Sequence, residues 1–173
     1  RLLYAAAMDR GLITTCSVIP DIPILINGFR AENFSRQYQG LASGIDVIQK
    51  SLNVPSVLLL KDYGIPAFYL ILKKLKFSNL FRPADDYGLS LILGGAEINM
   101  KDLAWAYSYL ANTNNQFANT KNTYPNIDSY QLSILLGEQK NGIDRTQVSP
   151  IFSVGSIYNM FNTMSGSSLS DGK

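Results

Sequence analysis

Histidine is absent from this chain of 173 residues, and cysteine occurs only once. Without histidine, the chain can form neither a Ser-His or Cys-His catalytic pair nor a metal site with histidine ligands. A single cysteine excludes an internal disulfide and a zinc site built from cysteines, so we expect no metal site. Cys16 itself is expected to be a small buried or half-buried apolar residue, not a reactive thiol.

Charged residues are also few: they make up 16% of the chain, and the formal net charge is +2. This charge is too small to favour nucleic acid as a partner, and we expect Lys73, Lys74 and Lys76 to form a solvated helix face. No apolar run is long enough to cross a bilayer, and no signal peptide is visible. Because the chain begins with Arg1, we expect a piece of a longer protein, so the absence of a membrane anchor here means little.

The hydrophobic fraction of 46% predicts one globular domain with a real core. Apolar periodicity and helix caps predict a mainly helical chain with minor strand. Ser43 and Asn99 are expected to be N-caps, with Asp46 and Asp102 at the third helical position, and Ser149-Pro150 is expected to begin the last helix. The predicted helices cover residues 2–10, 44–50, 55–63, 66–76, 100–111 and 150–164.

The remaining segments are predicted to be mostly irregular. Residues 14–40 are rich in proline and glycine, and only "PILING" (23–28) reads as a short strand. "YGLSLILGGAE" (87–97) predicts a short strand or a buried loop. Asn141-Gly142 indicates a hairpin turn. A polar loop is expected over 112–126 and a flexible tail over 165–173.

The joint "SLNVPS" (51–56) carries two polar side chains that stand two residues apart. Asn53 can cap the helix that begins at Pro55, and Val54 before proline is expected to be extended. Residues two apart in an extended segment point the same way, so Ser51 and Asn53 would offer a hydroxyl and an amide to one space. That pair suits holding a peptide-like substrate beside a nucleophile. The alternative is capping alone, in which the Ser51 hydroxyl serves only the local backbone.

With its flanks, this joint resembles the second motif of the penicillin-binding transpeptidases, whose motif set is Ser-x-x-Lys, Ser-x-Asn and Lys-Thr-Gly. "SGIDVIQK" precedes it as the corresponding helix does in that family. Gly-Gly-Ala-Glu (94–97) is similar to the penicillin-binding protein 1C type of class A enzymes. Further blocks that resemble the family in the same order are "LLYAAAMDRGLIT", "ENFSRQYQG", "LSLILGGAEINMKDLAWAYSYLAN" and "VSPIFSVGSIYNMF".

The resemblance implies a mainly α fold with minor β, the helical part of a penicillin-binding transpeptidase (β-lactamase-like) fold. Residues 1–173 would be a partial transpeptidase domain that starts after Ser-x-x-Lys and ends before Lys-Thr-Gly. The lysine of Ser-x-x-Lys would lie at or just before Arg1, and Asn99 stands where the family usually has threonine. The resemblance also implies an upstream glycosyltransferase domain and a membrane anchor, at the periplasmic face of the bacterial inner membrane.

The chemistry implied by the resemblance is acyl transfer between peptidoglycan peptide stems, without a cofactor. An upstream serine would attack the D-alanyl-D-alanine carbonyl, and β-lactams would acylate the same serine. Ser51 would relay a proton between the upstream lysine and the leaving group, and Asn53 would hold that lysine and the acyl-side amide. Both would lie at the edge of a cleft between two helices, facing the place where residues before Arg1 enter. The fragment itself is expected to be inactive.

A non-catalytic helical binding module is the alternative function. Its recognition surface would be built from tyrosines, of which the chain has 10, and from the polar loop over 112–126. Aromatic residues at helical spacing belong more often to a core. In either case, we expect the helix that contains Trp105 to pack against the helix that begins at Pro55.

Overall fold

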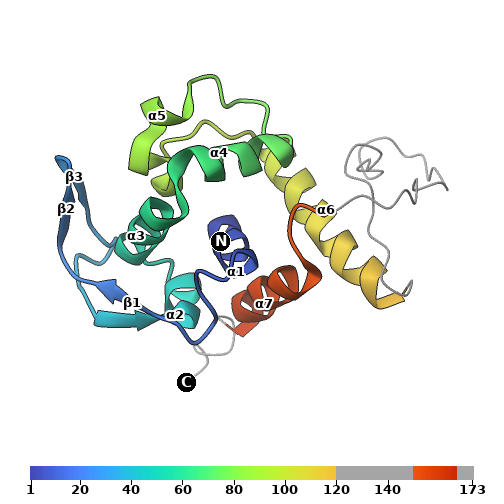
Figure 1. Ribbon diagram of the computed structural model, residues 1–173, viewed down its shortest axis with the longest axis horizontal. Helices are drawn as coiled ribbons and strands as arrows, with labels where there is room; N and C mark the ends of the chain where they lie inside the picture. Colours follow the sequence, from blue (N-terminus) through green and yellow to red (C-terminus); the bar gives the residue numbers. More distant parts are fainter. Residues whose placement is uncertain (120–149, 167–173) are drawn as a thin grey trace.

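The computed structural model describes residues 1–119 and 150–166, which are mainly helical with minor sheet (Figure 1). The expected fold class is confirmed at this level. The helices are α1 (Leu2–Asp9), α2 (Gly44–Gln49), α3 (Asn53–Tyr63), α4 (Ile65–Lys74), α5 (Ala84–Tyr87), the 3-10 helix η1 (Gly88–Leu93), α6 (Met100–Asn119) and α7 (Val154–Ser165). The strands are β1 (Val18–Asp21), β2 (Ile24–Ile26), β3 (Phe29–Ala31) and β4 (Gly40–Ser43).

Helix α1 lies at the centre of the molecule, between α3 and α7, and contacts both (Figure 1). Its sequence, LLYAAAMD, is apolar on every side, and a helix of this kind must be surrounded by other elements. Residues 2–7 are all buried. Three consecutive alanines at 5–7 let the neighbouring helices approach closely. The central position of α1 therefore follows from its composition.

The segment expected to be irregular, 14–40, contains most of the sheet residues. β1 and β4 pair antiparallel, with Ile19 opposite Ala42. This pairing joins segments about twenty residues apart, so no local signal reveals it. β2 lies within the predicted "PILING" strand and pairs with β3. Asn27 and Gly28 form the two-residue turn with φ of 50° and 83°, as a hairpin of this length requires.

Residues 87–97 form the 3-10 helix η1 and a turn, so the prediction of a strand or a buried loop was wrong. Gly94 ends η1 in the left-handed region, with φ 93°. Gly88 and Gly94 bound this apolar run, which packs against α3. Tyr87, the last residue of α5, donates a hydrogen bond to Glu97 over 2.9 Å and thereby holds the two ends of this segment together.

Helix α6 extends to Asn119, through much of the segment expected to be a polar loop. Asparagine and threonine are weak helix formers, but tertiary contacts override this preference. Thr113 is fully buried, and its hydroxyl donates to the Tyr109 carbonyl over 2.8 Å. The main helical neighbour of α6 is α7, where Tyr107 meets the ring of Phe161 at 6.3 Å. The expected packing of this helix against α3 was therefore wrong.

Helix α7 begins at Val154, later than expected, and its N-cap is Ser153 rather than Ser149. The Ser153 hydroxyl accepts from the backbone N–H of Ser156 over 3.3 Å. Asp9, at the end of α1, accepts from the backbone N–H of Ser153 over 2.9 Å and from the Ser156 hydroxyl over 3.0 Å. The start of α7 is thus set by a contact with α1, which sequence spacing could not reveal.

Two other predicted caps are confirmed. Ser43 accepts from the backbone N–H of Asp46 over 3.1 Å, and Asn99 accepts from that of Asp102 over 2.7 Å. Both capping residues are immediately followed by helix, so the signal is local and does not depend on tertiary contacts. α4 also forms close to its predicted bounds.

Cys16 is exposed, so the expectation of a buried or half-buried residue was wrong. It lies in the turn between α1 and β1. Lys73, Lys74 and Lys76 are exposed as expected, and Lys73 also donates to the Leu80 carbonyl over 2.7 Å. The predicted hairpin at Asn141-Gly142, and the parts of the predicted loop and tail at 120–126 and 167–173, lie outside the described residues.

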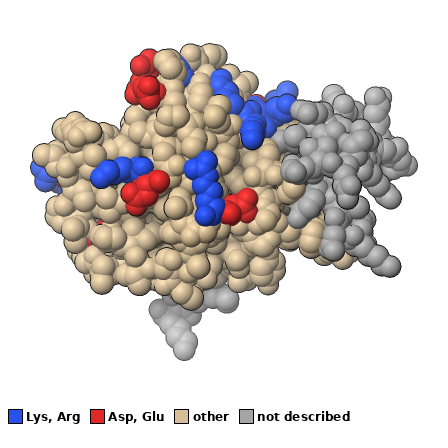
Figure 2. Space-filling view, in the orientation of Figure 1, with Lys and Arg blue, Asp and Glu red and all other residues tan. Residues whose placement is uncertain are grey.

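Charges of both signs are scattered over the face of the molecule shown in Figure 2. Among the described residues, no single helix has the length and hydrophobicity to span a membrane. α3 and α4 reach the required length and composition only as a pair, and they meet at a bend of 94°.

Asp46 makes the stability of α2 dependent on pH. Its carboxylate accepts from Lys50 over 2.7 Å and from the Ser43 hydroxyl over 2.7 Å, and these contacts hold the pKa of Asp46 below its ordinary value of 3.8. A carboxyl group whose pKa is lower in the folded than in the unfolded state stabilises the folded state at pH values above its unfolded-state pKa. This stabilisation is lost as the pH falls through the folded-state pKa. Both partners are partly exposed, so solvent screens the effect.

We therefore expect the free energy of unfolding of the chain to fall between about pH 5 and pH 2, with a contribution from Asp46. Urea unfolding at several pH values measures it. Asp46→Asn is the matched control, because it keeps the backbone N–H that Ser43 caps but cannot titrate. The same pH slope in both proteins would show that Asp46 does not contribute.

Candidate active site

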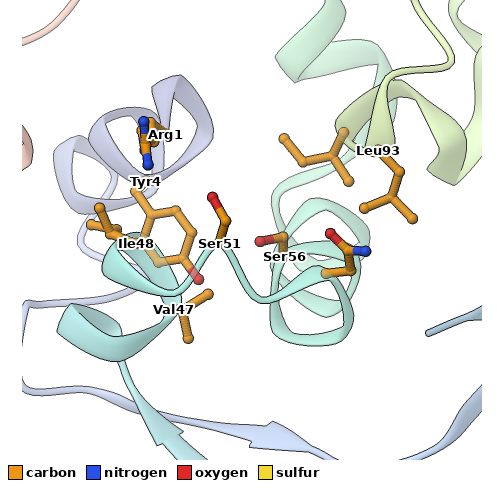
Figure 3. Close-up of a pocket in the computed structure, with 9 residues that line it drawn as sticks. Arg1, Tyr4, Val47, Ile48, Ser51, Ser56 and Leu93 are labelled. Atoms are coloured by element: carbon orange, nitrogen blue, oxygen red, sulfur yellow. The ribbon is translucent and has the colours of Figure 1, made fainter. Parts of the chain in front are cut away.

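A pocket of about 120 Å³ lies where α1, the end of α2, the beginning of α3 and η1 meet (Figure 3). It brings Ser51 and Asn53 together with Arg1, next to the start of the chain. Arg1 is the one charged residue of the lining in the part of the chain that the structure describes. The lining consists of Arg1, Tyr4, Val47, Ile48, Ser51, Asn53, Ser56, Ile92 and Leu93.

Ser51 lies in the turn between α2 and α3 with φ 51°, in the left-handed region that non-glycine residues rarely occupy. The assumption of an extended segment was therefore wrong for this residue. The backbone N–H of Leu52 donates to the Val47 carbonyl over 3.2 Å, which closes the end of α2 and forces the chain through this conformation. Strained residues of this kind persist where the surrounding structure holds them, often at functional sites.

The Ser51 hydroxyl is exposed and makes no hydrogen bond within the described ranges, 1–119 and 150–166. If Ser51 had only a capping role, its hydroxyl would hydrogen-bond to a nearby backbone group. Such a bond is made instead by Ser56, whose hydroxyl donates to the Leu52 carbonyl over 2.7 Å. In Figure 3, Ser51 and Ser56 lie in the gap between α1 and the first turn of α3. The Ser51 hydroxyl is therefore available to a group that enters the pocket.

Asn53 is the first residue of α3 and not its cap, which corrects the prediction that α3 begins at Pro55. The residue at the N-cap is Leu52, whose side chain cannot accept a hydrogen bond. The backbone N–H of Asn53 donates to Asn33 Oδ1 over 2.9 Å, and Asn53 Nδ2 donates to the Glu32 carbonyl over 2.9 Å. Asn53 Oδ1 accepts no hydrogen bond from the described residues, so it can accept one from a ligand.

Tyr4 is a pocket residue that the sequence reasoning missed. It is 3% exposed, and its hydroxyl has no partner with hydrogen-bond geometry among residues 1–119 and 150–166. Burial raises the pKa of Tyr4, and the nearby Ser56 hydroxyl offsets this only in part. The phenol therefore stays protonated and can donate. A tyrosine within an otherwise apolar helix was the available signal, because a buried hydroxyl usually has a partner.

The walls of the pocket are apolar, with Val47 and Ile48 from α2 and Ile92 and Leu93 from η1. Hydroxyl and amide groups between such walls can hold a peptide-like ligand and move a proton. The described residues contain no group of three potential metal ligands among histidine, cysteine, aspartate and glutamate.

A second groove of about 520 Å³ lies between α6 and α7 and is the larger of the two. It is open and mainly apolar. Among the described residues its lining has no carboxylate or basic group, so we assign the chemistry to the smaller pocket. Its lining residues are Asn114, Phe117, Ala118, Ser153, Val154, Gly155 and Tyr158.

No protein-family model matches the chain. Penicillin-binding protein 1C of Escherichia coli (strain K12) is 34% identical over 109 residues, which cover 63% of this chain and 14% of that protein. The chain is similar to penicillin-binding protein 1C.

Two solved structures share the fold of this chain. A peptidoglycan glycosyltransferase from Burkholderia ambifaria matches 99% of this chain and 54% of its own, with a TM-score of 0.72 and 14% identity. The D,D-transpeptidase domain of a peptidoglycan glycosyltransferase from Eggerthella lenta matches 98% of this chain and 47% of its own, with a TM-score of 0.66 and 13% identity. At such identities these two likenesses show the fold alone.

Penicillin-binding protein 1A from Haemophilus influenzae is 26% identical, with a TM-score of 0.55, over 65% of this chain and 17% of its own. The chain thus spans only a part of each of these proteins, 14% in the case of penicillin-binding protein 1C.

The pattern Ser-x-x-Lys does occur in the chain, at residues 170–173 (Ser-Asp-Gly-Lys). This corrects the expectation that the pattern is absent. It follows Ser51 and Asn53 instead of preceding them, which is the reverse of the order that the resemblance implies. It also lies outside the described residues.

Proposed function

We propose that this chain is part of the D,D-transpeptidase domain of a penicillin-binding protein, and that its parent cross-links peptidoglycan. The observation that carries the proposal is the Ser51 hydroxyl, which has no partner among the described residues and stands in a strained turn beside Asn53. Similarity to penicillin-binding protein 1C and to a solved penicillin-binding protein 1A supports it.

In this proposal, a serine upstream of Arg1 attacks the carbonyl carbon between the two terminal D-alanines of a peptide stem. An ester forms, the C–N bond breaks, and the departing D-alanine amine takes up a proton. Ser51 relays that proton from the upstream lysine, and Asn53 holds the lysine and the acyl-side amide. The amine of a second stem then takes the acyl group and releases the serine.

The partners in the proposal are peptidoglycan peptide stems and β-lactams, which acylate the same serine. No metal, organic cofactor or nucleic acid takes part. The parent protein carries a glycosyltransferase domain and a membrane anchor, and it acts at the periplasmic face of the bacterial inner membrane. The contrasting proposal is a helical binding module with a recognition surface of tyrosines. Four of these tyrosines cannot belong to such a surface, because Tyr4, Tyr63, Tyr87 and Tyr109 are buried.

Residues 1–173 alone are expected to form no covalent adduct with a fluorescent penicillin, because the proposal places the nucleophile upstream of Arg1. The measurement is fluorescence on a denaturing gel after boiling, with the longer parent protein as the positive control. A stoichiometric label on the 173-residue chain would overturn the assignment of roles. An unlabelled parent protein would overturn the proposed function.

A further inference from the structure

The loop between β3 and β4 supplies the cap of a helix that begins twenty residues later. Asn33 Oδ1 accepts from the backbone N–H of Asn53 over 2.9 Å and from that of Val54 over 3.2 Å. These are two of the N–H groups that a helix leaves unpaired at its beginning. Helix caps are normally the residue just before the helix, but here Leu52 cannot serve, so a distant side chain takes its place.

Asp21 on β1 determines the orientation of the Asn33 amide. Asn33 Nδ2 donates to Asp21 Oδ1 over 2.7 Å and to the Gln37 carbonyl over 3.0 Å, so both amide hydrogens are used. Asp21 Oδ2 accepts from the backbone N–H of Gln39 over 2.9 Å. With the nitrogen occupied on this side, the Asn33 oxygen must face α3.

Asp21 and Asn33 are 0% and 3% exposed, and a buried carboxylate is costly even when it is hydrogen-bonded. Leu52 at the N-cap offers no acceptor and Val54 is 0% exposed, so without Asn33 the backbone N–H of Val54 would be buried without a partner. The two residues therefore do more than fill the core: they define where α3 begins and how it is oriented relative to β1.

The same loop also holds the side chain of Asn53, because the Glu32 carbonyl accepts from Asn53 Nδ2 over 2.9 Å. Consecutive residues, Glu32 and Asn33, thus bind the side chain and the backbone of Asn53. The contact with Glu32 determines which amide atom of Asn53 is occupied and leaves Oδ1 for a ligand. The position of the adjoining Ser51 turn depends on the same anchor.

We infer that Asp21 and Asn33 are positioning residues, which hold Asn53, and through it the Ser51 turn, in the geometry that the pocket requires. The catalytic consequence of this inference rests on the proposed transpeptidase function. The positioning itself does not, and it can be tested on the 173-residue chain.

The first experiment is amide hydrogen exchange of the chain, followed by NMR. Asn33→Ala should speed exchange at Asn53 and Val54 by roughly 10-fold or more, with little change at amides of α4. Unchanged exchange at both amides would overturn the inference.

A charge swap distinguishes positioning from simple stabilisation. Asn33→Asp places a second carboxylate against buried Asp21 and should destabilise the chain strongly. Adding Asp21→Asn should restore part of the stability and slow exchange, because Nδ2 at position 21 then donates to the carboxylate at position 33, while the bond to the Gln37 carbonyl stays lost. That carboxylate still accepts from the helix N–H groups. A double variant no better than Asn33→Asp alone would overturn the inference, whether or not Asn33→Ala folds.

The second experiment measures fluorescent-penicillin acylation in the longer parent protein. Asn33→Ala should slow acylation by roughly 10-fold to 10²-fold while the final label stays stoichiometric, and the double variant should be acylated faster than Asn33→Asp alone. Faster exchange at Asn53 with an unchanged acylation rate would overturn the catalytic part of the inference. An unlabelled wild-type parent would overturn the proposed function, and hydrogen exchange would still decide the positioning.

Discussion

Ser51→Ala in the longer parent protein is expected to slow acylation by fluorescent penicillin by roughly 10²-fold or more, because it removes a proton relay. The melting temperature should change little, since the Ser51 hydroxyl is exposed and makes no hydrogen bond within the described part of the chain. The time course of labelling and thermal unfolding measure the two effects. If Ser51 were only a local cap, stability would fall by ~1 kcal/mol and acylation would be kept.

Ser51→Gly is the matched control, because it also removes the hydroxyl but relieves the strain of φ 51°. Alanine and glycine should therefore slow acylation alike, while glycine leaves the protein at least as stable as the wild type. A loss of activity that followed stability between these two variants would argue against the relay.

Asn53→Asp tests the second side chain of the pocket. The cap of α3 comes from Asn33 and not from Asn53, so the variant should fold. It loses the donor to the Glu32 carbonyl and places a negative charge beside that oxygen. We expect a folded protein that is poorly acylated. If the Ser51 and Asn53 variants were both acylated at normal rates, residues 51–56 would be an ordinary connection between helices without a catalytic role.

Leu60→Ala is expected to lower the free energy of unfolding by about 2–5 kcal/mol, through lost burial and the cavity left behind. Leu60 is 0% exposed and lies in α3, within the core cluster that contains α1. Urea unfolding of the 173-residue chain, followed by circular dichroism, measures the loss. Displacement of α3 would also move the first turn that carries Asn53.

Leu70→Ala on α4 is the matched control, because Leu70 is 60% exposed and the chemical change is the same. A substitution at such a site should change the stability by about 0.5 kcal/mol or less. Similar losses for the two variants would contradict the position of α3 in the core.

The helices were predictable wherever their signals are local. Ser43 and Asn99 cap the helices that follow them, and strong helix formers predicted a helix over 2–10, where α1 covers Leu2–Asp9. Leu59 of α3 is buried at 4% exposure, and Leu58 beside it is half-buried. In each case the relevant contact lies within a few residues, or burial follows from composition alone.

Predictions failed where a contact between distant segments decides the structure. The β1–β4 pairing, the start of α7 at Ser153 beside Asp9, and the long α6 all depend on partners far away in the sequence. Propensity cannot anticipate them, because burial and hydrogen bonds in the folded chain outweigh the small intrinsic preferences of asparagine, threonine and proline.

The sequence by itself determined the mainly helical class and, through "SLNVPS" and its flanks, the two candidate side chains, Ser51 and Asn53. Only the tertiary structure decided how they come together. Ser51 reaches the pocket through a left-handed turn, and Asn53 is held by Glu32 and Asn33. A sequence identifies residues with suitable side-chain chemistry. Backbone strain and hydrogen bonds between distant segments exist only in the folded chain, and they determine the orientation of each side chain.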